Sequence, residues 1–510
     1  MISDKIPYSK ISFFSAIVQD YLVQNTKLVP FYNRHNSIAN YLPQILEKEK
    51  QNINRDVLFE VLKNQNNQVQ LSSRTKNNIE SLVNKNTFTV TTGHQLCLFS
   101  GPLYCIYKII SAINLSQSLN EKYPSYHFVP LFWMASEDHD FEEVNHINLY
   151  GKKIEWNNSQ SGAVGRMNLS GIDGVLEELF QLMGEGENAE AMKQMVLNAY
   201  ASENSLAQAT RIFLNELFKE DGLVIIDGDD ARLKQQILPL IKNDVSNKRY
   251  YPILQEKSNE LAIDYSAQAY VREINFFSLE KNQRTRIEQP VNSSDIEQSP
   301  ERFSPNVLMR PLYQESVLPN VAYVGGGAEI AYWMQLKGVF ELENIPFPIL
   351  VLRNSALVIS KKHNERLKSL GFTSLDLFKS ELELHNQYIS GQNDEKSSDR
   401  EFNIIFGKIY EELKKTYSNP VQQQIIDAEQ QRHKKSLENM LKKLTKVDKQ
   451  KHKNALDQIS KIKKQYFPNN ALQERHENLI AFYLNHGDNF IKKMKEELNP
   501  LDSNFVVLAL

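Results

Sequence analysis

Short, nearly uninterrupted apolar runs recur along the first two thirds of the chain. They occupy residues 127–135 (HFVPLFWMA), 223–230 (LVIIDGDD) and 347–353 (FPILVLR). Runs of this kind are typical of parallel strands that are buried on both faces of a sheet. Residues 87–92 (TFTVTT) combine β-branched and aromatic residues and predict a further strand of the same sheet.

The stretch that follows the first predicted strand has the pattern of a loop and a helix. Gly93 ends the strand, and Gly101-Pro102 precedes an apolar run from Leu103 to Ile113 with helical spacing. Two buried strands joined by a helix predict a right-handed βαβ unit, which is the beginning of a doubly wound α/β core. Such a sheet places its ligand at the carboxyl ends of the strands.

Weaker patterns predict segments inserted into this core. Residues 1–85 are mostly helical in pattern, and residues 173–220 predict helices. Residues 146–170, including AVGRMNL at 163–169, and residues 265–290 predict short strands, whereas residues 291–305 read as a polar loop. We therefore expect one Rossmann-like core over residues 1–374, with insertions near 146–220 and 265–305.

The character of the chain changes near residue 375. Leu437, Leu441, Leu444, Leu456 and Ile459 follow an interrupted heptad pattern in a segment without glycine, which predicts a long helix of a coiled coil over 421–466. Residues 400–417 are its expected antiparallel partner. We expect a helical coiled-coil domain at 375–500 and a final strand at 501–510 that returns to the core.

Composition narrows the function classes. The chain has 510 residues, with 59 Lys+Arg against 62 Asp+Glu, so its overall charge does not favour nucleic-acid binding. The lysines at 431–464 are read as the solvated face of the coiled coil, with a nucleic-acid stripe as the alternative. Two cysteines are too few for a disulfide framework, and neither a signal peptide nor a membrane-spanning apolar run is evident. We expect a cytoplasmic protein without a membrane or nucleic-acid partner.

Polar residues follow the first two predicted strands directly. Gly93, His94 and Gln95 follow the first strand and match neither the GxGxxG nor the P-loop spacing. Glu137-Asp138-His139-Asp140 follows the second strand, with Asn145 and His146 close behind. Because burying unpaired charges is costly, this run predicts that its side chains face a solvent-filled cleft or a ligand. The alternative is that the run begins a helix, where carboxylates are favoured by the helix dipole.

Two other chemistries remain alternatives at these positions. The side chains of Asp138, His139, Asp140 and His146, with those of His94 and Cys97, are of types that bind Zn or Mn, so a metal-dependent hydrolase is conceivable. No HExxH motif or pair of CxxC motifs supports it, and we predict no protein metal site. Cys97 lies beside His94, but its apolar neighbours favour packing over a nucleophilic role; Cys105 is expected in the core.

A glycine triplet opens a third candidate segment. Gly325-Gly326-Gly327 precedes a predicted helix, so its backbone N–H groups suit an anion. Polar and aromatic side chains crowd the same stretch: Arg310, Gln314, Tyr323, Glu329, Tyr332, Trp333 and Gln335.

Three long blocks together resemble the cysteine-adding enzyme family of bacillithiol biosynthesis. They are TTGHQLCLFSGPLYCIYK, FVPLFWMASEDHDFEEVNHI and LMRPLYQESVLPNVAYVGGGAEIAYWMQLK, in this order. The resemblance implies a core similar to class I synthetases and nucleotidylyl transferases, with an appended coiled coil that forms a homodimer. It also implies a ligase that joins cysteine to glucosaminyl malate through an amide bond, with ATP or another nucleotide, with or without Mg, as the activating cofactor.

The resemblance also suggests roles for the candidate residues. His94 and Gln95 would contact phosphate or a developing oxyanion, and Asp138 and His139 would orient the amine or transfer protons. Arg310 would clamp the malate carboxylates. The expected substrate-binding set comprises Gly93, Trp133, Asp140, Asn145, His146, Arg310, Gln314, Tyr323, Gly325, Gly326, Gly327, Glu329 and Trp333. A non-catalytic scaffold with a synthetase-like core is the alternative from another class.

Overall fold

A five-stranded parallel sheet forms the centre of the larger part of the chain. The computed structural model describes residues 2–201, 204–280, 282–392 and 397–510. The strand order is β11-β10-β2-β3-β6, and every neighbouring pair is parallel. The predicted strands of the core are confirmed as β2 (Thr87–His94), β3 (His127–Met134), β6 (Val224–Asp227) and β11 (Ile349–Leu352), and β10 (Asn320–Gly325) completes the sheet.

The strand order creates a switch point between β2 and β10. From β2 the chain winds in one direction through β3 and β6, and later in the other direction through β10 and β11. Thr92 is paired with Val324 on one side, and Gly93 is paired with Trp133 on the other. In a doubly wound sheet, the crevice at the carboxyl ends of the two strands that flank the switch point is the usual ligand site.

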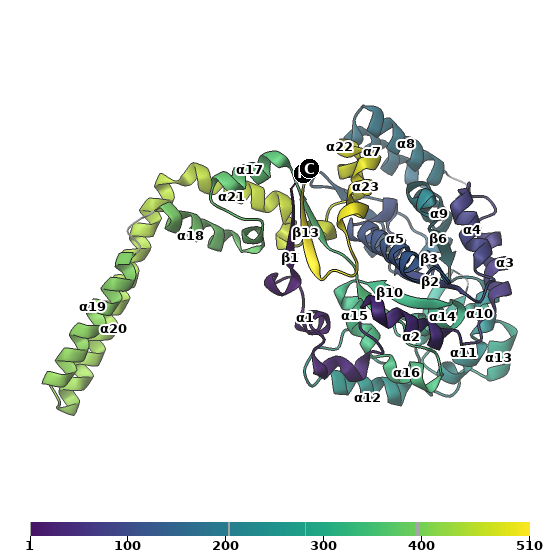
Figure 1. Ribbon diagram of the computed structural model, residues 1–510, viewed down its shortest axis with the longest axis horizontal. Helices are drawn as coiled ribbons and strands as arrows, with labels where there is room; N and C mark the ends of the chain where they lie inside the picture. The colour runs from purple at the N-terminus through teal and green to yellow at the C-terminus, as the bar shows by residue number, and fades with distance from the viewer. Residues whose placement is uncertain (1, 202–203, 281, 393–396) are drawn as a thin grey trace. The chain divides into compact units, whose positions relative to one another are not determined.

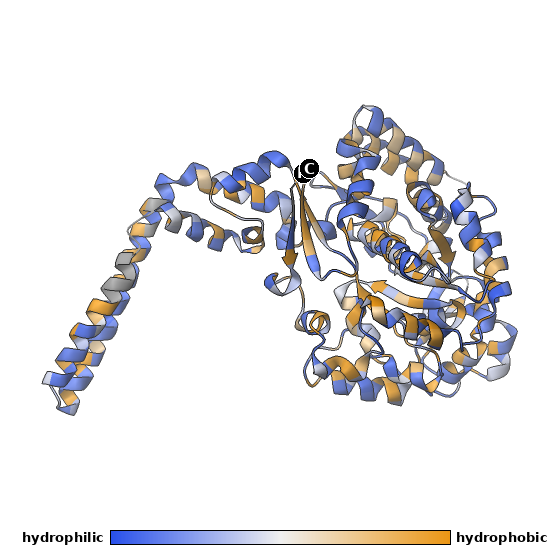
Figure 2. Cartoon of the chain, in the orientation of Figure 1, coloured by the Kyte–Doolittle hydropathy of each residue, from blue (hydrophilic) through white to orange (hydrophobic). Residues whose placement is uncertain are grey.

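Apolar residues from strands and helices bury the sheet, as the Rossmann-like prediction requires. Helix α5 (Tyr104–Lys122) connects β2 to β3 and packs on both strands, and Figure 2 shows apolar and polar residues alternating along it. Almost every residue of β2, β3 and β10 is buried, which explains why the β3 segment reads as a continuous apolar run. One core cluster comprises Tyr41, Ile45, Phe88, Val90, Ala112, Leu115, Leu119, Phe128, Val321, Ala322, Val324, Ile349 and Val351.

Further helices surround this sheet (Figure 1). Those before β6 are α1 (Ala16–Leu22), α2 (Tyr41–Lys48), α3 (Arg55–Gln65), α4 (Ser73–Ser81), α6 (Phe141–Val144), α7 (Ile172–Met183), α8 (Glu187–Ala199) and α9 (Leu206–Phe218). Those after β6 are α10 (Ala231–Gln236), α11 (Leu238–Val245), α12 (Tyr251–Leu261), α13 (Ser293–Gln298), α14 (Met309–Val317), α15 (Gly327–Met334), α16 (Lys337–Leu342), α22 (Leu479–His486) and α23 (Asp488–Glu497).

The inserted segments carry two small antiparallel sheets. Strands β4 (His146–Leu149) and β5 (Lys152–Glu155) form a hairpin, and β7 (Phe276–Glu280), β8 (Gln283–Arg286) and β9 (Phe303–Pro305) form a sheet in the order β8-β7-β9. The polar segment 291–305, expected as a loop, contains α13 and β9.

The expectation of a strand at residues 163–169 was wrong. Residues Val164–Arg166 form a 3-10 turn instead. The backbone N–H of Val164 donates to the Asp138 carbonyl (2.7 Å) and that of Gly165 to the Ser136 carbonyl (2.8 Å). These bonds to the loop after β3 replace the ladder that a strand would have required.

The second part of the chain is mainly helical. It contains α17 (Lys361–Ser369), α18 (Glu381–Gln392), α19 (Ser397–Thr416), α20 (Pro420–Lys451) and α21 (Lys453–Tyr466). Helices α19 and α20 form the antiparallel pair that was predicted, with Lys414 ion-paired to Asp427 (2.6 Å) and Tyr410 hydrogen-bonded to His433. The long helix expected at 421–466 is divided at His452, which is the N-cap of α21.

The chain divides into two compact units. The larger comprises Lys5–Leu357 and Gln473–Val506, and the smaller comprises Met1–Asp4, Val358–Leu472 and Val507–Leu510. The expected domain boundaries at 374/375 and 500/501 stay a prediction, whereas the compact units meet at 4/5, 357/358, 472/473 and 506/507. The chain crosses between the units within β1 (Ile2–Pro7), β12 (Ala356–Ile359) and β13 (Asn504–Ala509).

Those three strands form a sheet of their own in the order β1-β13-β12. The C-terminal strand therefore pairs outside the five-stranded sheet. Among the helices in the described ranges, none is long and apolar enough to cross a membrane.

Candidate active site

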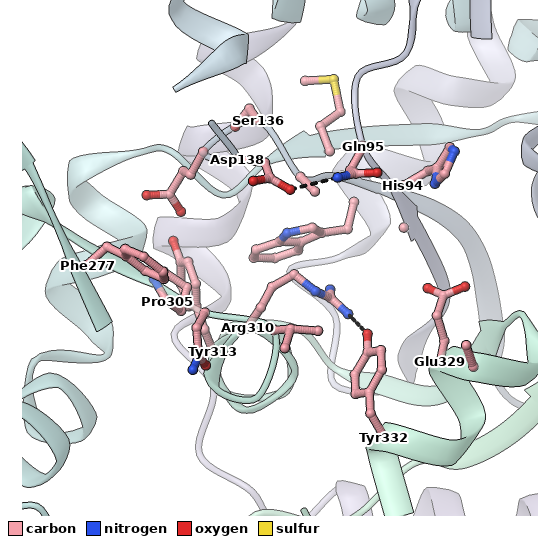
Figure 3. A pocket seen from close by; sticks show the side chains of 18 of the residues that line it. His94, Gln95, Ser136, Asp138, Phe277, Pro305, Arg310, Tyr313, Glu329 and Tyr332 are labelled. Atoms are coloured by element: carbon pink, nitrogen blue, oxygen red, sulfur yellow. Dashed lines mark hydrogen bonds between the residues drawn. The ribbon is translucent and has the colours of Figure 1, made fainter. Parts of the chain in front are cut away.

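A cavity of about 810 Å³ opens at the carboxyl ends of β2, β3, β10 and β11. Ten of the predicted site residues line it: Gly93, His94, Gln95, Trp133, Asp138, Arg310, Tyr323, Gly326, Gly327 and Glu329. They come from three segments that are far apart in the sequence and that the switch point brings together. Figure 3 shows Gln95 and Asp138 on one side of the cavity, and Arg310, Tyr332 and Glu329 on another.

A buried ion pair holds the two strands at the switch point. Lys108 of α5 is 2% exposed; its Nζ donates to the Gly93 carbonyl (2.9 Å) and pairs with Glu329 Oε2 (2.5 Å). Glu329 also accepts from the Gly326 N–H (2.8 Å) and the Tyr323 hydroxyl (2.7 Å). Burial alone would raise the pKa of Glu329, but Lys108 and these donors outweigh it and hold the pKa at about 2. Glu329 is therefore a carboxylate at neutral pH.

His94 is a neutral imidazole in this setting. Burial, with the nearby charge of Lys108, lowers the pKa of His94 to about 3. Its ring packs against Tyr104 at 5.1 Å between centroids. The sulfur of Cys97 lies 3.9 Å from His94 Nε2, but burial raises the pKa of this thiol to about 12. Cys97 is therefore a buried thiol and not an activated nucleophile.

The loop after β3 presents Asp138 to the cavity. Gln95 Nε2 donates to Asp138 Oδ2 (2.8 Å) and also to Glu143 Oε2 (2.7 Å), so one amide links two carboxylates. Burial would raise the pKa of Asp138, but the Gln95 hydrogen bond, the charge of Arg284 and backbone N–H groups lower it below its usual value. Asp138 is thus an ionised acceptor at neutral pH.

An ion pair and a hydrogen bond fix the two residues that precede Asp138. Glu137 pairs with Lys234, whose side chain is fully buried, and burial raises the pKa of Glu137 to about 7. The Ser136 hydroxyl hydrogen-bonds to Asp227 at the end of β6. Together with the 3-10 turn of residues 164–166, these contacts give the loop a single defined course.

The β7–β8 hairpin closes the cavity on the side of Asp138. Arg284 Nε donates to Ser304 Oγ (3.0 Å), and its guanidinium lies 3.9 Å from the Phe277 ring centroid. One of its terminal nitrogens lies 3.7 Å from Asp138 Oδ1 and 3.2 Å from His139 Nδ1. An inserted segment thereby completes a site that belongs to the core sheet.

Arg310 of α14 is a cation of the cavity wall whose hydrogen-bond acceptors are all neutral groups. Its Nη1 donates to Gln314 Oε1 (3.0 Å), and its Nη2 donates to the hydroxyls of Tyr323 and Tyr332 (3.3 Å each). Within the described ranges, no carboxylate oxygen lies within 4 Å of this guanidinium. Its charge therefore remains available to an anionic ligand.

Seven of the predicted site residues do not line the cavity. Gln314 and Trp333 are fully buried behind it, and Gly325 packs against Tyr323 and Glu329. The chain turns away after His139, so that Asp140 is exposed. His146 begins β4, and Asn145, the residue before it, donates weakly to Glu155 (3.4 Å). His139 is exposed; its backbone N–H donates to Asp138 Oδ1 (2.8 Å), and its ring lies beside Arg284 and Phe277.

Sequence reasoning missed four residues that line the cavity: Lys108, Arg284, Tyr313 and Arg353. Glu137 and Tyr332 were named as candidates but not assigned to the site, and both line the cavity. Lys108 carried a signal, because it is a lone cation inside an apolar helix, which is costly unless paired. Arg284 lies in a polar strand (QRTR) and carried none. The described side chains include no group of three or more His, Cys, Asp and Glu that could hold a metal ion, so the candidate ligands of the hydrolase alternative do not converge.

A doubly wound sheet with a charged cavity at its switch point defines a Rossmann-like protein with a small-molecule site. The chain matches the family model "Bacillithiol biosynthesis BshC, N-terminal Rossmann-like domain" over residues 1–354 and "Bacillithiol biosynthesis BshC, C-terminal coiled-coil domain" over residues 356–510. It therefore belongs to the BshC family of bacillithiol biosynthesis.

Curated relatives agree with this assignment over the full chain. A protein of Flavobacterium johnsoniae is 41% identical and covers 100% of both chains. One of Cytophaga hutchinsonii is 36% identical over 98% of each chain, and one of Bacillus cytotoxicus is 25% identical over 97% of this chain and 98% of its own. Each carries the name "Putative cysteine ligase BshC".

Proposed function

We propose that this protein is a ligase that joins the carboxyl group of cysteine to the amine of glucosaminyl malate. The observation that carries this proposal is Arg310, a cation in the cavity wall with neutral partners only, in a chain that matches the BshC family from end to end. Arg310 suits the carboxylates of the malate moiety, because a guanidinium fork binds a carboxylate through two parallel hydrogen bonds.

The other side of the cavity suits the amine. Asp138 is an ionised acceptor there, and Gln95, whose Nε2 also bonds Glu143 outside the cavity lining, adds an amide. These groups can hold the amine of glucosaminyl malate and accept a proton as the amide bond forms. Neutral His94, which lines the cavity, can donate a ring N–H to the oxyanion that develops on the reacting carboxyl carbon.

Joining a free carboxylate to an amine at neutral pH requires activation, and a nucleotide such as ATP, with or without Mg²⁺, would supply it. The residues present fit such a group. Gly327 and Ala328 open α15 at the cavity wall, where first-turn N–H groups suit phosphate, and Arg353 and Arg475 line the same cavity. The volume of about 810 Å³ accommodates more than one small molecule.

The decisive experiment is a turnover assay with the purified full-length chain. Cysteine, glucosaminyl malate and Mg²⁺ are incubated with ATP, with other nucleoside triphosphates or with none, and the condensed thiol is detected by mass spectrometry. Product that depends on a nucleotide supports the whole proposal, whereas product without one removes the nucleotide from it. No condensed thiol under any of these conditions, from folded protein, would refute the ligase assignment.

We further propose that the chain forms a homodimer through α19 and α20. Apolar side chains are exposed along this helix pair, which Figure 2 shows as a mixture of apolar and polar residues. Five of them are 49–64% exposed: Ile404, Ile405, Ile409, Val421 and Ile425. A second copy of the same helix pair would bury them, as in other coiled coils.

Light scattering coupled to size-exclusion chromatography tests this assembly. The wild-type chain is expected at twice its mass of 59.0 kDa, and the double variant Ile405→Lys/Ile425→Lys at the mass of one chain. The matched control is Glu412→Lys, which changes charge on α19 without removing an apolar side chain. A wild-type chain that elutes as a monomer at micromolar concentration would contradict the proposal.

A further inference from the structure

The hydrogen bonds of Arg310 share an unusual feature: all three acceptors are uncharged. An arginine in a protein interior is commonly held by a carboxylate, which fixes its position and also neutralises it. Here an amide oxygen and two phenol oxygens fix the guanidinium, so its position is determined without loss of its charge. The question is what orients those neutral groups.

The amide of Gln314 is oriented by a buried ion pair. Gln314 Nε2 donates to Glu315 Oε1 (2.9 Å), which leaves Gln314 Oε1 facing Arg310. Glu315 is fully buried and pairs with Lys48 of α2 (3.4 Å), which also donates to the Glu315 carbonyl (3.0 Å). Asn320 Nδ2 donates to the same Glu315 Oε1 (2.7 Å). The amide therefore cannot rotate without losing a bond to a carboxylate.

The phenol of Tyr323 is oriented in the same way. Its hydroxyl donates to Glu329 Oε1 (2.7 Å), so its oxygen accepts from Arg310. Glu329 is itself paired with Lys108 (2.5 Å). Two of the three neutral acceptors, Gln314 and Tyr323, thus stand between Arg310 and a carboxylate that is paired with a lysine.

We infer that Gln314, oriented by the Lys48–Glu315 pair, is a positioning residue that keeps Arg310 both fixed and uncompensated, and so sets the preference for an acidic acceptor. This inference rests on the proposed function, in which Arg310 receives the malate carboxylates. Gln314 contacts Arg310 and not the cavity, so it acts only through the guanidinium. A charged group in its place would compete with the substrate carboxylate.

The test measures binding of L-malate to the full-length protein by calorimetry, alongside the KM values of cysteine and glucosaminyl malate. Gln314→Glu places a carboxylate on Arg310 and is expected to weaken L-malate binding by at least about tenfold, because two like charges then share one cation. Gln314→Met removes the acceptor but keeps the charge of Arg310 free, and a smaller, few-fold loss is expected. The KM for cysteine stays unchanged in both variants.

A paired variant tests the role of the ion pair. Lys48→Met/Glu315→Leu replaces two buried charges by apolar groups of similar size, a change that commonly preserves folding. The Gln314 amide loses the carboxylate that orients it, so L-malate binding is expected to weaken several-fold. The melting temperature falls as well, because the buried amides of Gln314 and Asn320 lose an acceptor, and an unchanged KM for cysteine shows that the fold is kept.

The outcomes separate the two proposals. Wild-type affinity for L-malate in both Gln314→Glu and the paired variant would overturn the positioning role while leaving the acidic site intact. Loss of L-malate and cysteine binding together would also overturn it, since a general loss of structure moves both. A wild-type protein that binds neither L-malate nor glucosaminyl malate would instead refute the proposed function itself.

Discussion

Replacement of Arg310 by Met removes the proposed clamp for the acidic acceptor and leaves its volume largely filled. In the free protein, Arg310 makes three hydrogen bonds to neutral groups, at 3.0, 3.3 and 3.3 Å, and no ion pair to a described carboxylate. Such bonds contribute about 1 kcal/mol each to folding, so the variant should lose roughly 1–3 kcal/mol of unfolding free energy.

The effect on the acceptor substrate should be larger than the effect on folding. Truncating one partner of a buried, hydrogen-bonded charge pair costs about 2–5 kcal/mol, which corresponds to a loss of about 30-fold to several thousand-fold in kcat/KM for glucosaminyl malate. Arg310→Lys keeps the charge but not the fork, and an intermediate loss is expected. The KM for cysteine should remain near the wild-type value in both variants.

The assay combines kinetics at saturating cysteine with thermal unfolding of the same preparations. Arg366→Met is the matched control, because it removes an arginine of the smaller unit that binds Gln458. Unchanged kcat/KM for glucosaminyl malate in folded Arg310→Met would refute the reasoning, since the malate carboxylates would then bind elsewhere.

Three other changes test separate parts of the account. Cys97→Ala should keep kcat/KM within about twofold, because a thiol whose pKa is about 12 is almost entirely protonated at pH 7; a loss above tenfold would restore a catalytic thiol. Gly93→Ala would place a Cβ 3.1 Å from the Trp133 carbonyl and 3.7 Å from Arg310 Nη1, so stability should fall by about 1–3 kcal/mol with a loss of activity, measured by thermal unfolding and turnover.

The third change concerns pH. Lys379 and Thr373 outweigh burial and lower the pKa of Asp376 from 3.8 to about 2, so its stabilisation is complete above pH 4 and is lost as pH falls towards 2. The melting temperature of Asp376→Asn should therefore lie below that of the wild type at pH 7, and the two should converge near pH 2. A gap that is independent of pH would show that Asp376 acts through packing alone.

The strands of the core could be predicted because their buried environment restricts which residues they contain. A strand covered on both faces must be apolar at nearly every position, as 127–135 and 347–353 are. The segment 163–169 has similar composition but became a 3-10 turn, because Gly165 packs so closely on Ser136 that a Cβ there would lie 2.5 Å from the Ser136 Cβ. Only the folded loop after β3 creates that constraint.

The run Glu137-Asp138-His139-Asp140 shows a similar limit at the site. Its position after a buried strand predicted a site at this edge of the sheet; a cavity opens there, and Glu137 and Asp138 line it. The run has no regular secondary structure, however, so neither a period of 2 nor one of 3.6 tells which side chains face inwards. Hydrogen bonds from residues 164 and 165 fix the course of the run and therefore which of its side chains face the cavity. Those residues belong to a segment for which the sequence predicted the wrong structure.

The charge balance of the site lies furthest beyond sequence reasoning. Lys48 and Glu315 are 267 residues apart, and each alone reads as an ordinary surface residue. Folding buries both completely, so that burial lowers the pKa of Lys48 and raises that of Glu315, while their mutual attraction opposes both shifts. A pair that costs desolvation energy and reaches no solvent contributes most clearly by orienting its neighbours, and the neighbour here is the amide that holds Arg310. A neutral side chain at position 314 leaves the guanidinium charge of Arg310 for a substrate, whereas a carboxylate there would neutralise it. Gln314 lies outside the cavity lining, yet it influences which ligand binds inside.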